Sequence, residues 1–273
     1  MTLAEALNFG ANIIGQRDAA LFLSHIKGES CGHIKLHGDE PLAPACEKTY
    51  QDYLARRQRG EPLQYIIGSW DFMGNTLGTD SRALIPRPET ELLVEAAFNF
   101  INKKSVRVMD LCTGSGCIAI ALASMAKDAG VDMHVVAVDV SPSALALARE
   151  NAGDCTNIRF VQSNLFDDLE NEKFDIIISN PPYIPSGEMS ELEPVVRDYE
   201  PHLALDGGVD GMDFYRRIVP RSLDFLCPGG ALFLEIGPVA VKDILTESGF
   251  EDIHLSNDYA GLPRILRGIA PFA

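Results

Sequence analysis

The sequence predicts an α/β fold, in which a doubly wound, mostly parallel sheet with an antiparallel edge hairpin follows a small helical bundle. Three observations support this prediction. Up to about residue 60, apolar residues recur at spacings of three to four, as in amphipathic helices. From Val106 onward, short apolar runs alternate with helical segments, which is typical of a parallel sheet with helices on both faces. The last two apolar runs are placed to pair as a hairpin.

The charge balance argues against one class of protein. The 273 residues include 23 Lys and Arg against 39 Asp and Glu, a formal net charge of −16. Residues 1–80 contribute −3 (7 basic, 10 acidic) and residues 81–273 contribute −13 (16 basic, 29 acidic). Because Lys and Arg carry most binding to a phosphate backbone, a protein that coats nucleic acid is disfavoured. The composition, 46% hydrophobic and 23% charged, is that of a globular protein.

The sequence gives no indication of membrane insertion or export. No apolar run reaches the roughly 20 residues of a transmembrane helix, and the first basic residue is Arg17. We therefore expect a cytoplasmic protein with no membrane partner. Cysteines without a Cys-x-x-Cys pair are expected to be free thiols there, and this applies to Cys31, Cys46, Cys112, Cys117, Cys155 and Cys227.

One cluster contains residue types that bind metals. Cys31, His33 and His37 lie close in sequence, and the two histidines have the i, i+4 spacing of a helical metal site. Gly32 and Gly38 instead favour an exposed loop between helices, and no fourth ligand has a regular spacing. We expect no metal site.

Three regions follow from the patterning. Residues 1–68 are predicted to form a helical domain of three to five helices, separated by glycines and a proline-rich stretch. Residues 69–88 are predicted to form a hairpin connector, because glycines interrupt its short apolar runs. Residues 89–273 form the α/β domain. It opens with a helix over Glu89–Asn102, whose first acidic residues suit the positive end of the helix dipole.

Strands and helices then alternate along the chain. The predicted strands are Val106–Leu111, His134–Val138, Ile158–Gln162, Phe174–Ser179 and Ala231–Ile236. The predicted helices are Ile118–Ala129, Pro142–Ala152 and Met212–Leu226. Asp252–Leu255 and Arg264–Ile269 are expected to pair as a hairpin at one edge of the sheet. Ligands of such sheets bind at the carboxyl ends of the strands.

A glycine-rich turn follows the first strand of this domain. Residues 114–119 satisfy G-x-G-x-x-A, and Asp139 ends the second strand, where a carboxylate suits ribose hydroxyls. After the third strand, Asn164 and Leu165 suit the edge and face of an adenine, although a turn-forming asparagine explains that position equally well. Two cofactors fit this pattern: a nicotinamide dinucleotide and S-adenosylmethionine.

The fourth strand runs directly into Asn180-Pro181-Pro182-Tyr183. The two prolines fix the backbone and remove two amide donors, so carbonyl oxygens are left as acceptors. The side-chain oxygen of Asn180 adds another acceptor, and Tyr183 offers an aromatic face. Such a set suits the two hydrogens of a planar NH2 group. This favours a methyltransferase acting on nitrogen over an oxidoreductase.

These motifs resemble a known family. Asn180–Tyr183 with Asp110–Cys117 is similar to S-adenosylmethionine-dependent methyltransferases that modify exocyclic amines or amide nitrogens. The chain more closely resembles the release factor glutamine methyltransferase family from about Gly60 to Gly268. The segments that carry this closer resemblance are Gly60–Gly68 with Phe72, Ile85–Glu91, Arg197–Leu205, and Asp258–Gly261 with Arg264. Asn164 and Cys112 depart from the family, where Asp and Gly, respectively, are commoner.

The resemblance implies a class I methyltransferase fold, with S-adenosylmethionine as cofactor and class I peptide chain release factors as protein substrates. The reaction would be transfer of a methyl group to the side-chain amide nitrogen of glutamine in a Gly-Gly-Gln motif. Residues 1–68 would recognise the release factor, without direct contact to nucleic acid.

Roles for individual residues follow from both lines of reasoning. Asn180, Pro181 and Tyr183 are expected to be catalytic, and Pro182 joins them in the substrate slot. On the resemblance alone, Glu89 and Thr90 lie near the methionine end of the cofactor. The expected cofactor contacts are Cys112, Thr113, Gly114, Ser115, Gly116, Asp139, Asn164, Leu165 and Asn180.

Three alternatives remain open at this stage. A methyltransferase acting on a nucleic-acid base could use the same asparagine slot after base flipping, although the net charge of −16 argues against it. A dinucleotide-dependent oxidoreductase would use the glycine turn and Asp139. A noncatalytic module that binds a partner through its helical region would leave the motifs at both strand ends without a role.

Overall fold

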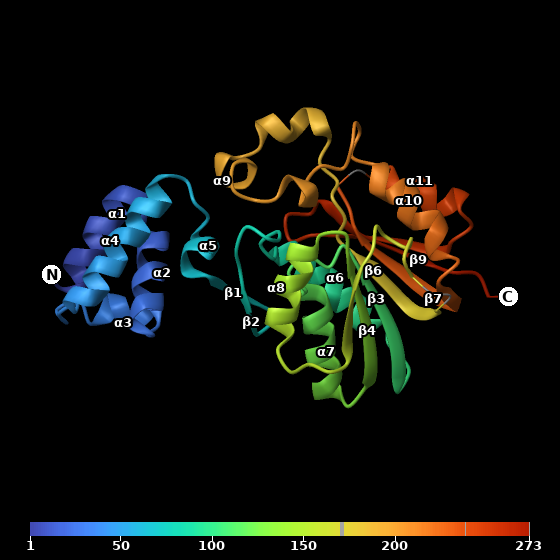
Figure 1. Cartoon of the computed structure of the whole chain (residues 1–273), viewed down its shortest axis with the longest axis horizontal. Coiled ribbons are helices and arrows are strands. Elements are labelled where there is room, and N and C mark those ends of the chain that lie inside the picture. The colour runs from blue at the N-terminus through green and yellow to red at the C-terminus, as the bar shows by residue number, and fades with distance from the viewer. Residues whose placement is uncertain (170–171, 238, 273) are drawn as a thin grey trace. The chain divides into compact units, whose positions relative to one another are not determined.

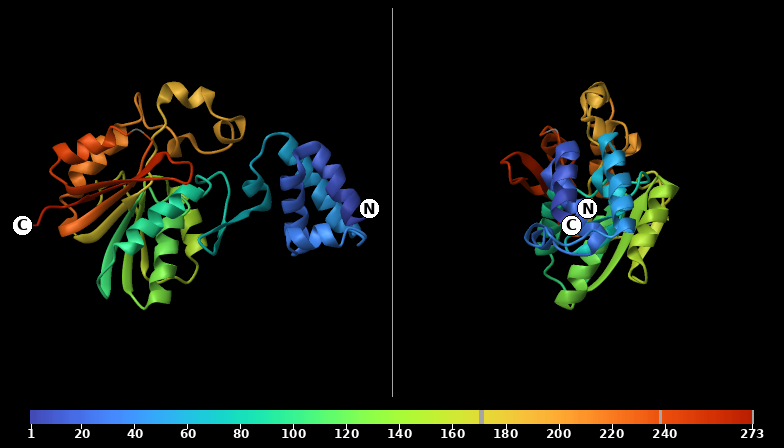
Figure 2. Two further views of the ribbon diagram at one scale, coloured as in Figure 1. Left: turned by 180° about the vertical axis from the view of Figure 1, so that it is seen from behind. Right: turned by 90° about the vertical axis from the view of Figure 1, so that its left-hand side faces the viewer.

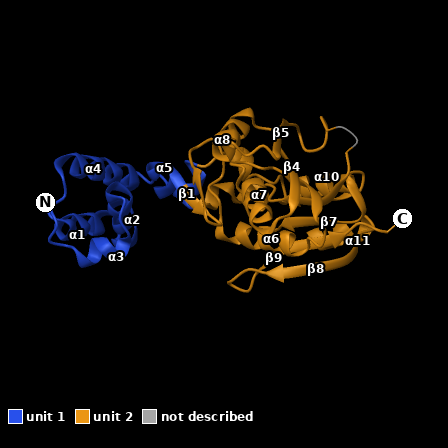
Figure 3. Ribbon diagram, turned by 90° about the horizontal axis from the view of Figure 1, so that it is seen from below, with its two compact units in different colours: residues 1–69, 193–199 blue, residues 70–192, 200–273 orange. Residues whose placement is uncertain are grey.

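The computed structural model describes residues 1–169, 172–237 and 239–272 (Figure 1). The chain divides into two compact units (Figure 3). Unit 1 comprises residues 1–69 and the separate segment Glu193–Tyr199, and unit 2 comprises residues 70–192 and 200–273. The inclusion of a segment from the far half of the sequence in unit 1 was not predicted. In the part of the chain that is described, no helix is both long and apolar enough to cross a membrane.

Unit 1 is built from short helices, as the apolar spacing predicts. They are α1 (Leu3–Ile14), α2 (Gln16–Lys27), α3 (Cys31–Leu36), α4 (Pro44–Gln58) and α5 (Leu63–Ile67). Thr2 and Glu5 form a capping box that starts α1. Tyr50 of α4 is fully buried, and its hydroxyl donates to the Ala6 carbonyl at 3.2 Å, which ties α4 to α1.

The predicted exposed loop around Cys31 is wrong, because these residues form α3. The Ser30 side chain caps the helix by accepting a hydrogen bond from the His33 amide at 3.1 Å, and this outweighs Gly32 within it. The rings of His33 and His37 stack at 4.0 Å. The residue that completes a cluster of metal-ligand type with the two histidines is Glu40, whereas Cys31 lies outside it. All six cysteines are free thiols.

Unit 2 begins with the predicted hairpin, formed by β1 (Ser69–Phe72) and β2 (Asn75–Gly78). The helix predicted over Glu89–Asn102 is α6 (Pro88–Asn99). It ends three residues early, because the amides of Phe100 and Ile101 close a final turn on the carbonyls of residues 97 and 98.

A seven-stranded sheet, counted over the described residues, forms the centre of unit 2 in the order β5-β4-β3-β6-β7-β9-β8. Its strands are β3 (Ser105–Leu111), β4 (Asp132–Asp139), β5 (Ile158–Gln162), β6 (Phe174–Ser179), β7 (Leu226–Glu235), β8 (Glu251–Asn257) and β9 (Pro263–Ile269). β9 runs antiparallel to both of its neighbours, and the pairings between β3, β4, β5, β6 and β7 are parallel. The predicted sheet and edge hairpin are therefore confirmed.

Helices cover both faces of this sheet, as Figures 1 and 2 show. α6 and α7 (Cys117–Ala129) pack on one face, with α8 (Pro142–Ala152) beside α7. α10 (Asp213–Ser222) and α11 (Val241–Glu247) pack on the other. The strand order changes direction at β3, since β4 lies on one side of it and β6 on the other. A crevice at the carboxyl ends of these strands is the expected ligand site.

Two predicted boundaries in the second half are wrong. The helix predicted over Met212–Leu226 ends at Ser222, and β7 begins at Leu226 rather than Ala231. Leu226 pairs with Phe174, so its apolar side chain belongs to the sheet rather than to the helix. The stretch after β6, to which no element was assigned from the sequence, contains short helical turns at Ser186–Glu191, Pro194–Arg197 and His202–Ala204.

Candidate active site

A cavity in unit 2 is bordered by residues at the carboxyl ends of the parallel strands, where sequence reasoning places the ligand. Its lining includes eight of the nine predicted cofactor contacts, namely Cys112, Thr113, Gly114, Ser115, Asp139, Asn164, Leu165 and Asn180. The ninth, Gly116, is the N-cap residue of α7 and does not line the cavity. Its φ of +82° and the Ala148 Cβ, 3.1 Å from the place a Cβ would occupy, explain the glycine.

The glycine turn is held by a fully buried carboxylate. Asp110 Oδ2 accepts hydrogen bonds from the Thr113 hydroxyl at 2.5 Å and from the Ala119 amide at 3.2 Å. Burial raises the pKa of Asp110 to about 7. Cys112 adopts a left-handed conformation with φ of +59°, so this turn retains backbone strain of about 1 kcal/mol at a residue other than glycine. The loop is thus fixed before any ligand binds.

Asp139 links the glycine turn to the start of α8. Its carboxylate accepts from the amides of Gly114 and Ser141, both at 2.9 Å. The N-cap of α8 is Ser141 rather than Asp139. Burial raises the pKa of Asp139, and the backbone hydrogen bonds oppose this shift. A carboxylate has about four acceptor positions, so Asp139 keeps capacity for ligand hydroxyls at the cavity wall.

Asn164 also lines the cavity, but its side-chain oxygen is engaged. Arg217 of α10 donates to Asn164 Oδ1 at 2.9 Å. Leu165, next in sequence, is buried with φ of +59°. The apolar contact expected of Leu165 is available at the wall, whereas an adenine edge would meet the amide group of Asn164 rather than a free oxygen.

Sequence reasoning missed a large part of the wall. Arg82–Arg87 lines the cavity, together with Pro201, Leu203, Ala204 and Phe214. Two of these stretches lie in segments that carry the family resemblance, but no local pattern indicated that they border a cavity. Phe214 lies in α10, whereas the other residues belong to irregular segments or a single short helical turn, which hydrophobic periodicity does not detect.

Glu200 connects two of the missed segments. Its side chain is only 1% exposed. It accepts from the Ile85 amide at 3.1 Å and forms an ion pair with Arg87 at 2.5 Å. Because Ile85 and Arg87 lie on one wall segment and Pro201 follows Glu200 directly, this buried carboxylate holds both segments in place.

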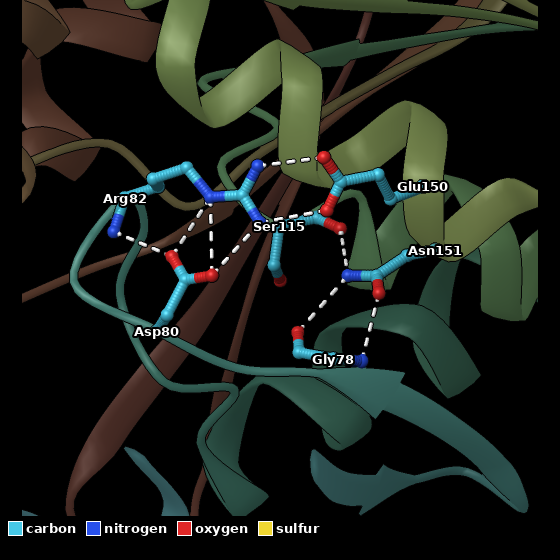
Figure 4. A network of polar contacts seen from close by, with 6 residues as sticks. All are labelled: Gly78, Asp80, Arg82, Ser115, Glu150 and Asn151. Atoms are coloured by element: carbon cyan, nitrogen blue, oxygen red, sulfur yellow. Dashed lines mark hydrogen bonds and ion pairs between the residues drawn. The ribbon is translucent and has the colours of Figure 1, made fainter. Parts of the chain in front are cut away.

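A second network fixes the start of the same wall (Figure 4). Arg82 forms ion pairs with Asp80 at 2.8 Å and with Glu150 of α8 at 2.7 Å. The Asn151 side chain accepts from the Gly78 amide at 2.7 Å and donates to the Ser115 carbonyl at 3.0 Å. β2, the wall segment, the glycine turn and α8 therefore form one connected structure.

The asparagine motif meets α6 and β7 at the cavity. Asn180 Nδ2 donates to Thr90 Oγ1 at 3.1 Å, and the Thr90 hydroxyl donates to Glu235 Oε2 at 2.6 Å. The Tyr183 hydroxyl faces Glu235 Oε1 at 3.5 Å. Asn180 and Thr90 line the cavity, as does Pro182, whereas Tyr183 does not.

Pro181 also lies outside the cavity lining. Tyr183 is packed closely by glycines, since a Cβ on Gly237 would lie 2.6 Å from its ring and one on Gly207 would lie 2.6 Å from its backbone. Of the three residues expected to be catalytic, Asn180 is therefore the one that the cavity exposes directly.

Known proteins and family models match most of this chain. Residues 12–68 match the family model of the PrmC N-terminal domain, and residues 88–209 match that of the methyltransferase small domain. The release factor glutamine methyltransferase of Geobacter sulfurreducens is 42% identical over 84% of this chain and 81% of that protein. That of Thermodesulfovibrio yellowstonii is 36% identical over 92% and 91%. The chain belongs to the release factor glutamine methyltransferase family.

This family membership covers more of the chain than the sequence motifs did. The motifs begin at about Gly60, whereas the family match extends into the helices of unit 1. The alternative of a dinucleotide-dependent oxidoreductase is set aside, because the chain belongs to the release factor glutamine methyltransferase family.

Solved structures confirm the fold. A methyltransferase from Pyrococcus furiosus matches with a TM-score of 0.52 and 18% identity, covering 72% of this chain and 89% of that chain. The 16S rRNA N2 G1207 methyltransferase of T. thermophilus matches with a TM-score of 0.53 and 21% identity, covering 74% and 49%. The sheet of unit 2 is thus a methyltransferase sheet.

The buried Asp110 predicts a pH-dependent stability. Its pKa of about 7 exceeds the ordinary value of 3.8, so the folded state holds a proton that the unfolded state has lost between these values. Its contribution to stability is complete below about pH 4 and is lost as the pH rises through about 7. Asp110→Asn should therefore lose less stability than the wild type between about pH 5 and 8, as measured by thermal unfolding.

The matched control is Asp154→Asn, at an exposed position of unit 2. This variant should retain the pH dependence of the wild type. A wild-type pH dependence in Asp110→Asn would contradict the assignment.

Proposed function

We propose that this protein transfers a methyl group from S-adenosylmethionine to the side-chain amide nitrogen of the glutamine in the Gly-Gly-Gln motif of peptide chain release factors. Family membership over most of the chain carries the reaction class. The observation that supports the chemistry is the position of Asn180. It borders the cavity just after β6, and its side-chain amide NH2 group donates to Thr90.

The cavity residues fit S-adenosylmethionine. Ser115 Oγ is buried and has no hydrogen-bond partner within the described residues, and it lies in the cavity lining. Asp139 would hold the ribose hydroxyls, and Leu165 would pack on the adenine. The acidic surroundings, −13 over residues 81–273, favour a positively charged sulfonium. When bound, this cofactor supplies a methyl group activated by the sulfonium.

The protein's own contribution is to orient the nucleophile. An amide nitrogen is a poor nucleophile because its lone pair is delocalised, so holding it in line matters more than a general base. Asn180 Oδ1 and the Pro181 carbonyl accept its two hydrogens, and Pro182 and Tyr183 shape the slot. Orientation of bound reactants supplies up to about 7 to 11 kcal/mol in favourable cases. The acceptors also strengthen as positive charge develops on nitrogen.

The proposed function predicts a product that can be located. A class I release factor incubated with the protein and S-adenosylmethionine should gain one methyl group, about 14 Da, on the glutamine of its Gly-Gly-Gln loop. Peptide mass spectrometry locates the group. A methyl group on another residue, or none, would refute the proposal, and a factor with that glutamine changed to alanine is the control.

Asn180→Ala should remove the main orienting acceptor. We expect kcat to fall by about 10² to 10³, the range for loss of one preorganised hydrogen-bonding group, while cofactor affinity by calorimetry changes little. Asn102→Ala, at an exposed position of unit 2, is the control and should keep wild-type activity. Near-normal methylation by Asn180→Ala would be incompatible with its role.

We also propose that unit 1 binds the release factor, because a folded protein substrate needs a surface beyond the slot. The exposed large apolar side chains of unit 1 include Phe9, which is 48% exposed, and Leu36, which is 84% exposed. Exposed apolar side chains of this size mark candidate contact positions. Deletion of the helices is a poor test, because Tyr199 of the Glu193–Tyr199 segment donates to the Arg59 carbonyl at 2.9 Å and would lose its partner.

Leu36→Ser tests this binding role without deleting a helix. We expect kcat/KM to fall about tenfold for the whole release factor and to stay unchanged for a short Gly-Gly-Gln peptide, because only the whole factor reaches unit 1. Val209→Ser, at a position 88% exposed in unit 2, is the control. Equal losses on both substrates would show that Leu36 does not act in recognition.

A further inference from the structure

Three neighbouring elements, β6, β7 and α6, meet next to Asn180. Ser179 of β6 lies beside Leu234 of β7 in the parallel register, so Asn180, just after β6, and Glu235, the last residue of β7, are neighbours at the edge of the sheet. Thr90 lies in the first turn of α6, which packs against β7. Thr90 and Glu235 are both only 2% exposed.

The hydrogen bonds between these residues have a direction. The Thr90 hydroxyl donates to Glu235 Oε2 at 2.6 Å. The Thr90 oxygen then has only lone pairs to offer to Asn180. It accepts from Asn180 Nδ2 at 3.1 Å, and Nδ2 is the donor end of that side chain.

This direction decides which end of the Asn180 amide faces the cavity. The oxygen and nitrogen of a primary amide diverge from one carbon, so binding Nδ2 at Thr90 turns Oδ1 away from Thr90. No described residue donates to Oδ1. The opposite orientation would present an NH2 group to the substrate, and two NH2 groups cannot hydrogen-bond each other productively.

We propose that Thr90 and Glu235 are positioning residues for methyl transfer, which fix the Asn180 amide with its oxygen toward the substrate. This inference rests on the proposed function, since it deepens the role of Asn180 there. Neither residue needs to touch the reacting nitrogen.

Glu235 has hydrogen-bond partners on both its backbone and its side chain. Its backbone carbonyl accepts from the Tyr215 hydroxyl at 2.9 Å, and its Oε1 faces the Tyr183 hydroxyl. Burial raises the pKa of Glu235, whereas the hydrogen bond from Thr90 and the positive charge of Arg264 lower it. These contacts hold the buried Glu235 carboxylate in place, and its Oε2 accepts the hydrogen bond from the Thr90 hydroxyl.

Substitutions at Thr90 separate orientation from packing. Thr90→Val keeps the shape but removes the hydroxyl, and we expect kcat on the release factor to fall about tenfold or more, the effect of losing one orienting hydrogen bond. KM and cofactor affinity by calorimetry should stay within about threefold. Thr90→Ser keeps the hydroxyl and should restore kcat to within about threefold of the wild type.

Glu235→Gln tests the direction of the hydrogen bonds that run from Asn180 through Thr90 to residue 235. A glutamine amide can donate to Thr90 as well as accept from it, so Asn180 is no longer forced into one orientation. We expect kcat to fall, again with KM nearly unchanged. Thr76→Val, at an exposed position of β2, is the control and should behave as the wild type.

A measurement without turnover completes the test. In protein labelled with ¹⁵N-asparagine, the Asn180 side-chain NH2 should be protected from exchange in the wild type and in Thr90→Ser but not in Thr90→Val. Three results would overturn the positioning role of Thr90 and Glu235. They are a kcat of Thr90→Val within threefold of the wild type, equal impairment of Thr90→Val and Thr90→Ser, and equal NH2 protection in all three proteins. If the wild type does not methylate release factors, the proposed function fails. The NH2 protection still shows whether Thr90 fixes the orientation of the Asn180 amide.

Discussion

The site depends on the alignment of β3 and β6 at their carboxyl ends. Leu111 pairs with Ser179 across the parallel register, and the buried Ser179 hydroxyl donates to the Leu111 carbonyl at 2.7 Å. The glycine turn begins at the residue after Leu111, and the asparagine motif begins at the residue after Ser179. One strand pair therefore brings the glycine turn and the asparagine motif to the same edge of the sheet, at the point where the strand order reverses.

Buried carboxylates then fix what this alignment brings together. Asp110 holds the glycine turn, Glu200 holds two wall segments, and Glu235 fixes Thr90. Each carboxylate is desolvated and therefore depends on its hydrogen-bond donors, because an unpartnered buried charge is costly. This cost makes alternative arrangements unfavourable. Such rigidity suits a reaction in which orientation, rather than proton abstraction, is the main contribution of the protein.

Sequence reasoning recovered the sheet, its edge hairpin and the glycine turn, because apolar runs and glycine positions report directly on strands and tight turns. It did not recover the wall formed by Arg82–Arg87 and by the segment after Glu200, since irregular chain leaves no periodic pattern. Nor did it assign a role to Glu235, whose place beside Asn180 depends on the register between β6 and β7. The prediction that the helix extends to Leu226 was wrong, because Leu226 pairs with Phe174 in the sheet and this pairing outweighs local helical preference.

After the asparagine motif, the chain passes from unit 1 back to unit 2 at the peptide bond between Tyr199 and Glu200. Tyr199 belongs to unit 1, where its hydroxyl donates to the Arg59 carbonyl, and the next residue, Glu200, belongs to unit 2, where it holds Ile85 and Arg87. No flexible linker separates these two anchors. The Glu193–Tyr199 segment therefore continues directly into Glu200, which holds the wall segment, and into Pro201 of the cavity lining.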